Sequence, residues 1–174
     1  MSHDPGPLET RVFPDRIAEL GFSMRLPPDW ISHPLPEEEL NFDNPTQMVP
    51  LAIVTAPHAA IVWAVAARPG YGEGTLLQWA HYLAGESGLS LRAVGGSRIG
   101  ELPAIVGEAV QDSDLGPMRV RFAFLEDGGR LVNLTLTAPE LLADAVYGVW
   151  TEGLASLRLE TPRGATVELG ATID

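Results

Sequence analysis

Cysteine and lysine are both missing from this chain of 174 residues. Without cysteine the protein has no disulfide, no thiolate nucleophile and no zinc–thiolate site. Without lysine it has no Schiff-base lysine, no phosphate-loop lysine and no lysine general base, because all 11 basic residues are arginine. These absences remove several common classes of enzyme chemistry.

Long apolar runs are missing as well. No run approaches the roughly 20 residues that cross a bilayer as a helix, and the longest, residues 59–67, suits a buried strand. The first seven residues lack the basic region and the apolar stretch of a signal peptide. The sequence therefore predicts a cytoplasmic protein without membrane insertion. Its wealth of alanine, glycine, proline and arginine is typical of a GC-rich bacterial genome.

Positive charge is scarce, since the net charge is −12 and the sequence pI is about 4.6. An acidic chain repels nucleic-acid phosphates and anionic membrane surfaces, so we expect neither as a partner. The charge is uneven: residues 1–50 carry a net −6, residues 51–100 carry +1 and residues 101–174 carry −7. The better explanation of this charge is that it keeps the protein soluble, and the second is that it attracts a basic partner.

The length and the 45% apolar content suit one globular domain. We expect a disordered N-terminus over residues 1–8, a single domain over residues 9–160 and a C-terminal tail over residues 161–174. Alternating apolar residues predict a strand at residues 22–26, which Pro27 and Pro28 end before Trp30 folds back onto the core.

The remaining pattern predicts strands and two helices. Strands are expected at residues 10–13, 51–55, 60–67, 89–94, 97–99, 104–111, 118–124, 132–136 and 157–159. The pair Gly95-Gly96 is expected to break the chain between two of them, and Asp127-Gly128-Gly129 to form a hairpin turn.

One helix is predicted from Thr75 to Glu86, with Leu76, Leu77 and Ala80 in its buried stripe. The second helix is predicted to begin at the capping box Thr137–Glu140 and to continue to about Ser156. Strands so closely spaced must pair antiparallel. The sequence therefore predicts an α+β fold, in which an antiparallel β-sheet of about six or more strands is flanked by two main α-helices.

Three segments carry a family resemblance. Residues 22–30, Phe-Ser-Met-Arg-Leu-Pro-Pro-Asp-Trp, look like the opening strand, proline turn and tryptophan of the PsbP-like superfamily. Gly100-Glu-Leu-Pro-Ala104 is similar to its mid-chain turn, and residues 122–159 are similar to its C-terminal half. That superfamily includes PsbP, Mog-type Ran-binding factors, and DcrB-like and LpqN-type bacterial proteins. The resemblance implies a PsbP-like α/β/α sandwich and mostly non-catalytic binding roles, with no shared active-site residues.

No motif for catalysis, a cofactor or a metal is complete. The glycines of residues 70–74 lack the third glycine of a dinucleotide loop. The turns at Ser87 and Ser97 lack the last glycine of a nucleophile elbow. The four histidines share no metal-ligand spacing, and the two acids around Ser113 lack the rest of a calcium loop. We therefore predict no catalytic, cofactor or metal residues.

Binding residues are expected in two loops. The connection over residues 31–49 is unusually long, and such loops often carry function. Its candidates are Glu37, Glu38, Glu39 and Phe42, and Tyr71 is the candidate of the loop over residues 68–75, since exposed aromatics often anchor contacts. The sequence predicts a non-catalytic binding module for a protein partner, whose identity and stoichiometry stay open. The alternatives are a secretion-effector chaperone or toxin-immunity accessory protein, a small-molecule-binding protein, and a carboxylate-dependent enzyme.

Overall fold

The structure is a computed structural model that describes residues 6–13, 21–35, 48–68, 75–127, 130–160, 166–168 and 171–172. The strands are β1 (Glu9–Phe13), β2 (Phe22–Leu26), β3 (Ile31–Ser32), β4 (Val49–Thr55), β5 (Val62–Arg68), β6 (Ser90–Ile99), β7 (Leu102–Ser113), β8 (Gly116–Asp127), β9 (Arg130–Pro139), β10 (Arg158–Glu160), β11 (Thr166–Glu168) and β12 (Ala171–Thr172). The helices are α1 (Leu76–Glu86), the 3-10 turn η1 (Glu140–Leu142) and α2 (Tyr147–Ala155).

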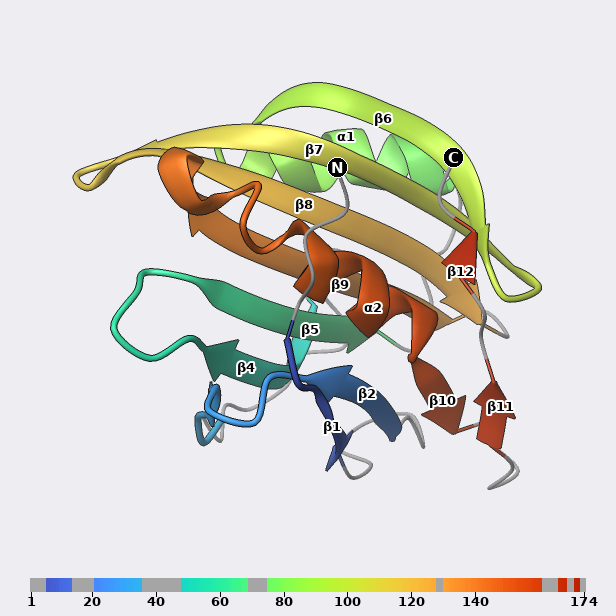
Figure 1. Cartoon of the computed structure of the whole chain (residues 1–174). Coiled ribbons are helices and arrows are strands. Elements are labelled where there is room, and N and C mark those ends of the chain that lie inside the picture. The colour runs from blue at the N-terminus through green and yellow to red at the C-terminus, as the bar shows by residue number, and fades with distance from the viewer. Residues whose placement is uncertain are drawn as a thin grey trace.

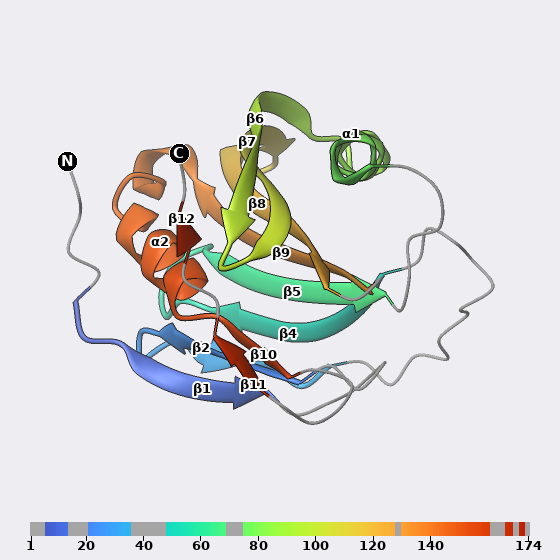
Figure 2. The same cartoon turned by 90° about the vertical axis from the view of Figure 1, so that its right-hand side faces the viewer.

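The strands form two antiparallel sheets (Figure 1). The larger sheet has eight strands in the order β12-β6-β7-β8-β9-β5-β4-β3, and the smaller has four in the order β1-β2-β10-β11. Helix α1 lies on one face of the larger sheet, while α2 and the smaller sheet lie on the other (Figure 2). The predicted α+β fold, an antiparallel sheet with two main helices, is confirmed.

Helix α1 begins as the sequence predicts. The Thr75 N–H donates to the Gln78 side chain at 2.9 Å, and the Gln78 N–H donates back to the Thr75 hydroxyl at 3.2 Å. This reciprocal capping box satisfies two backbone donors that the first turn leaves free. The helix buries Leu76, Trp79 and Ala80 against the sheet, but Leu77, predicted to be buried, is 41% exposed.

The opposite face of the larger sheet holds the main core. Trp63 of β5 is fully buried and packs against Trp150 of α2, with ring centroids 5.2 Å apart. Gly153, one turn further along α2, lets this helix approach because a Cβ atom there would lie 2.7 Å from the Trp63 ring. The predicted core position of Trp30 is confirmed, and the side chain is 8% exposed.

The second helix begins later than predicted. Thr137 does not cap a helix, because it pairs with Val120 and Val62 inside the sheet, and β9 continues to Pro139. The Glu140 carboxylate binds Arg119 instead of returning to the backbone of Thr137. The chain then forms η1, and α2 starts only at Tyr147. The predicted helix start at the capping box was wrong because strand pairing outweighed a local signal.

Two further segments differ from the sequence reading. Gly95 and Gly96 do not break the chain: β6 runs through both and pairs with β7 along its whole length. The region after residue 160, to which the sequence assigned no element, contributes β11 beside β10 and β12 beside β6.

Candidate functional site

The binding residues predicted from the sequence, Glu37, Glu38, Glu39, Phe42 and Tyr71, lie outside the described residues. Their role as contacts stays a prediction. The described part of the chain presents another candidate site, which lies on the larger sheet.

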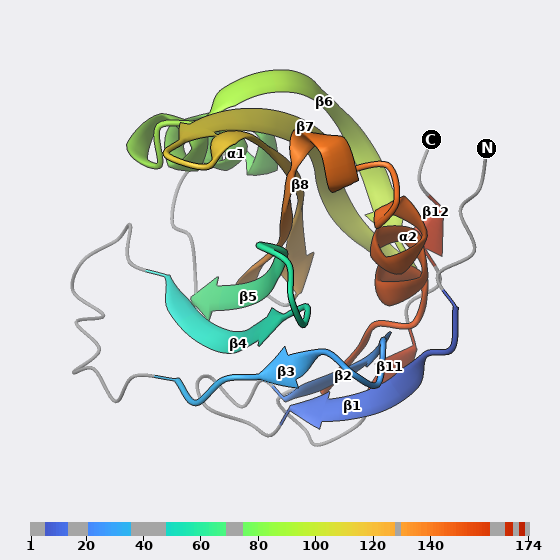
Figure 3. The same ribbon diagram turned by 60° about the vertical axis from the view of Figure 1, so that its left-hand side comes forward.

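A groove opens where α2 leaves part of the larger sheet uncovered. The sheet curves, so that β6 and β7 rise beside η1 and α2 (Figure 3). Two adjoining cavities, of about 320 and 480 Å³, lie along this space and share Glu108. We call it the β6–α2 groove, and its lining residues are Arg92, Ala93, Val94, Gly95, Gly96, Val106, Gly107, Glu108, Ala109, Val110, Pro117, Arg119, Arg121, Glu140, Tyr147 and Trp150.

Small side chains keep the groove open. On the face toward α2, Gly95 of β6 pairs with Val106 of β7, and Ala93 pairs with Glu108. A Cβ atom on Gly95 would meet nothing within 4 Å. The cavity therefore exists because the strands beside α2 carry little side-chain volume at these positions.

A buried arginine forms one wall. Arg121 of β8 is 4% exposed, and its Nε–H donates to Glu108 Oε1 at 3.2 Å while Nη1 donates to the Ala143 carbonyl at 2.5 Å. Its guanidinium also lies 4.8 Å from the ring centroid of Tyr147, within cation–π range. These contacts compensate for removing the cation from water and fix its position.

Arg119, two residues earlier on the same face of β8, repeats this arrangement nearer to solvent. Its Nε–H donates to Glu140 Oε2 at 3.2 Å, and Asp144 lies 3.6 Å from its Nη1. Burial by itself would lower the pKa of Arg119, but the hydrogen bond and charge of Glu140, with the charges of Glu108 and Asp144, raise that pKa above its ordinary value. The arginine is therefore held as a cation beside the carboxylates.

Acid–base catalysis finds little support in this geometry. Each of the groove's carboxylates, Glu108 and Glu140, is turned toward an arginine, whereas paired catalytic carboxylates face a common substrate. Among the described residues that line the two cavities there is no serine, threonine or histidine. Within the described ranges no cluster of histidine and acidic side chains could hold a metal ion. The groove offers aromatic rings, hydrogen-bonding guanidinium groups and an open backbone, which are means of binding.

Arg68 is a second unusual cation, at the end of β5. Its guanidinium carbon lies 5.3 Å from the ring centroid of Trp79 in α1. Its Nε and Nη1 atoms are buried and have no hydrogen-bond partner among the described residues. Burial lowers the pKa of Arg68 below its ordinary value. This residue adjoins the predicted loop over residues 68–75, but no described cavity opens onto it.

The sequence did not indicate the groove. Arg119 and Arg121 alternate with the apolar residues of β8, a pattern that normally places polar side chains in solvent. The pairing of Arg121 with Glu108 across β7 and β8 could have indicated the groove, but this pairing is known only once the register of the two strands is known.

The chain matches no known family by sequence, and no curated protein matches it. Solved structures do match. The solution structure of cyanobacterial PsbP (CyanoP) from Synechocystis sp. PCC 6803 aligns with a TM-score of 0.61 at 12% identity, covering 87% of this chain and 93% of that one. LpqN of Mycobacterium tuberculosis, described as involved in cell envelope biogenesis, aligns with a TM-score of 0.59 at 10% identity, covering 87% and 91%.

These matches show that the chain has the PsbP-like fold, as the resemblance of residues 22–30 implied. At this identity they carry over no functional residue. Among the helices that the structure describes, none is both long and apolar enough to cross a membrane.

Proposed function

We propose that this protein is a non-catalytic binding module that holds a partner protein in the β6–α2 groove. The observation that carries the proposal is the composition of the groove: Tyr147, Trp150 and Arg121 converge on one cavity without a nucleophile among the lining residues. Tyrosine, tryptophan and arginine are the residues that most often dominate the energy of protein interfaces.

Apolar groups beside the groove favour a protein over a small molecule. Leu141 of η1 is 97% exposed, Leu142 is 39% exposed and Tyr147 is 38% exposed. Leu141 and Leu142 directly follow the groove residue Glu140 in η1, and Tyr147 of α2 lines the groove itself, so exposed apolar side chains lie at the margin of the groove. A small ligand would occupy the cavity alone, whereas a protein would cover both surfaces.

The predicted loops add a second element to this proposal. Glu37, Glu38, Glu39, Phe42 and Tyr71 are proposed as further contacts that select a partner with basic surface groups. A chaperone of a secreted effector or an immunity protein is a particular form of the same role. A secretion or toxin gene beside this gene would support that form, and an unrelated neighbourhood in several genomes would count against it.

Blocking the groove tests the proposal. In Gly95→Phe an aromatic ring enters the cavity, and the backbone accommodates the change because nothing lies within 4 Å of the new Cβ atom. The matched control is Gly85→Phe in α1, on the other face of the sheet, where a Cβ atom also meets nothing within 4 Å. Both variants keep the ion pairs of Arg119 and Arg121.

The readout is quantitative cross-linking of each tagged variant in cells of the source organism, followed by mass spectrometry. We expect one or a few proteins to be cross-linked by the wild type and by Gly85→Phe, and to fall about tenfold or more with Gly95→Phe, as when a hot-spot pocket is closed. Equal recovery by all three proteins would exclude the groove as the contact surface. Replacing Glu37, Glu38 and Glu39 with glutamine tests the loop separately.

A further inference from the structure

The outer edge of β6 borders the groove and is largely unpaired in the described part of the chain. There β12 pairs with β6 at Ile99 and Arg98. From Ser90 to Gly96, β6 pairs with no other strand on this side among the described residues. A strand edge of this kind presents backbone donors and acceptors to which another extended chain can bind.

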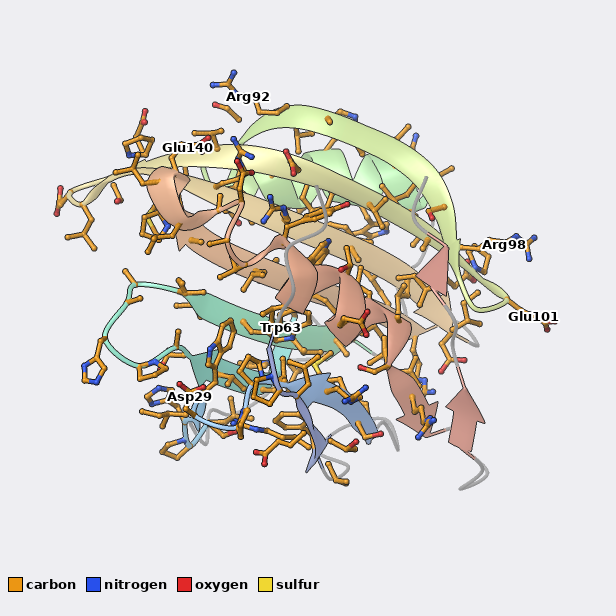
Figure 4. The ribbon with its side chains drawn as sticks, viewed as in Figure 1. Asp29, Trp63, Arg92, Arg98, Glu101 and Glu140 are labelled. Carbon is orange, nitrogen blue, oxygen red and sulfur yellow. The ribbon has the colours of Figure 1, made fainter. Side chains whose placement is uncertain are left out.

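The charge of this edge is opposite to that of the protein as a whole. β6 contains Arg92 and Arg98 and no acidic residue, although the chain has a net charge of −12. Both arginines are exposed, and they extend from the two ends of β6 away from the body of the molecule (Figure 4). At physiological salt, charges beyond about 8 Å are largely screened, so a segment that approaches β6 responds to the charges of this strand and its neighbours more than to the net charge of the chain.

The glycines of β6 determine which side chains fit on an added strand. Gly95 faces the groove, opposite Val106, and has open space where a side chain would be. A large apolar side chain on a neighbouring strand covers a cross-strand glycine well. Ala93 lies one strand repeat away from Gly95, and the bulge between Leu91 and Ala93 places Arg92 among the groove residues beside it. A side chain two residues from the apolar one would lie opposite Ala93, within reach of the long side chain of Arg92.

We propose that the partner docks an extended acidic segment along the outer edge of β6 as an added strand, with a large apolar side chain facing Gly95 and an acidic side chain facing Arg92. This inference rests on the proposed function of the groove. The antiparallel pairing of β12 with Arg98 and Ile99 shows that this edge accepts a strand.

A second copy of the chain fits the edge less well. Two β6 strands side by side would bring two sets of Arg92 and Arg98 together, and like charges across paired strands are destabilising. An acidic segment of another protein avoids this cost and gains from both arginines.

A library of displayed random decapeptides, selected on the full chain at about 0.15 M salt, tests the inference, because this ionic strength confines the attraction to charges near the edge. We expect the enriched peptides to have a large apolar residue with Asp or Glu two positions away. Synthetic copies are then measured by fluorescence anisotropy. The charge variant is Arg92→Glu with Arg98→Glu, and the control is Arg25→Glu on β2, an exposed arginine of the smaller sheet.

The charge variant should weaken peptide binding about tenfold or more, and Arg25→Glu should leave it within about twofold, because rim charges act locally. Methylating alternate backbone nitrogens of the peptide removes strand donors without changing the protein, and should abolish binding in one of the two alternating patterns. Failure to enrich any peptide, or binding insensitive to both methylation patterns, would overturn the added-strand proposal.

The two proposals fail differently. If the cellular partner is lost with Gly95→Phe but retained by the variant carrying Arg92→Glu and Arg98→Glu, the groove remains the site and the acidic strand is refuted. If Gly95→Phe retains the partner, the proposed function itself is wrong.

Discussion

Gly107 gives the sharpest test of the groove's architecture. It lies in β7, and β6 bulges between Leu91 and Ala93 directly beside it. A Cβ atom on Gly107 would lie 2.2 Å from the Ala93 carbonyl oxygen, 2.7 Å from the Phe122 ring and 3.1 Å from the Val94 Cα atom. Alanine at this position therefore requires the β6 backbone to move.

The expected loss of stability follows from the atoms that the new methyl group would contact. Inserting a methyl group into a packed site costs about 1–3 kcal/mol, and a backbone oxygen in a paired strand yields less than the end of a flexible side chain. We expect Gly107→Ala to lower the free energy of unfolding by about 3 kcal/mol, the upper part of that range. For a domain of this size each kcal/mol shifts the Tm by about 2–4 °C, so the Tm should fall by about 6–12 °C.

The assay is urea and thermal unfolding followed by far-UV circular dichroism, with Gly96→Ala as the matched control. Gly96 lies in the neighbouring strand, and a Cβ atom there meets nothing within 4 Å. Alanine should leave stability unchanged or raise it by about 0.5–1 kcal/mol, because glycine in a strand loses more backbone entropy. If the two variants unfold within about 0.5 kcal/mol of each other, a difference typical of surface substitutions, the close approach of β6 and β7 is not as described.

Three further predictions use the same unfolding assay. Gly153→Ala should lower the free energy of unfolding by about 1–2 kcal/mol despite the better helix propensity of alanine, because the new methyl group meets the Trp63 ring. Gly85→Ala, where a Cβ atom meets nothing within 4 Å, should raise it by up to about 1 kcal/mol. Stability changes of the same sign in the two variants would contradict the packing of α2. Glu108→Gln should lower the free energy of unfolding by about 2 kcal/mol, because its partner Arg121 has a side chain that is only 5% exposed. Glu140→Gln should lower it by less than about 1 kcal/mol, because its partner Arg119 is 26% exposed. A larger loss for Glu140→Gln would show that burial of the arginine does not decide the strength of these ion pairs. Arg68→Met should raise the free energy of unfolding by about 1 kcal/mol, because an apolar side chain replaces two buried nitrogen atoms that have no hydrogen-bond partner among the described residues. A clear loss of stability would show that the guanidinium has a hydrogen-bond partner in the folded protein.

Local signals in the sequence were reliable where one residue's chemistry decides the outcome. Pro27 and Pro28 end β2, α1 occupies the range that its apolar stripe predicts, and β8 pairs with β9 up to Asp127 and Arg130, which flank the predicted hairpin turn. Each of these depends on a missing donor, a local periodicity or a turn sequence within a few residues. The antiparallel pairing of neighbouring strands and the PsbP-like fold followed from such signals taken together.

Signals failed where distant strands compete. The segment Thr137–Glu140 has the composition of a helix start, but Val120 and Val62 offer it a strand ladder on both sides. The same competition carries β6 through Gly95 and Gly96, because β7 pairs with it along both residues. Cross-strand pairing is set by residues far apart in the sequence, so no local window contains it.

The absences noted at the outset were determined by the sequence alone, since a chain without cysteine and lysine cannot use cysteine-thiolate or lysine-amine chemistry in any fold. The candidate site was decided by the tertiary structure. Register places Arg121 opposite Glu108, the bulge in β6 adjoins Gly107, and α2 stops short of β6, leaving the β6–α2 groove open. The physical reason is that a binding surface is made of neighbours in space, and strand pairing brings those neighbours together from separate parts of the chain.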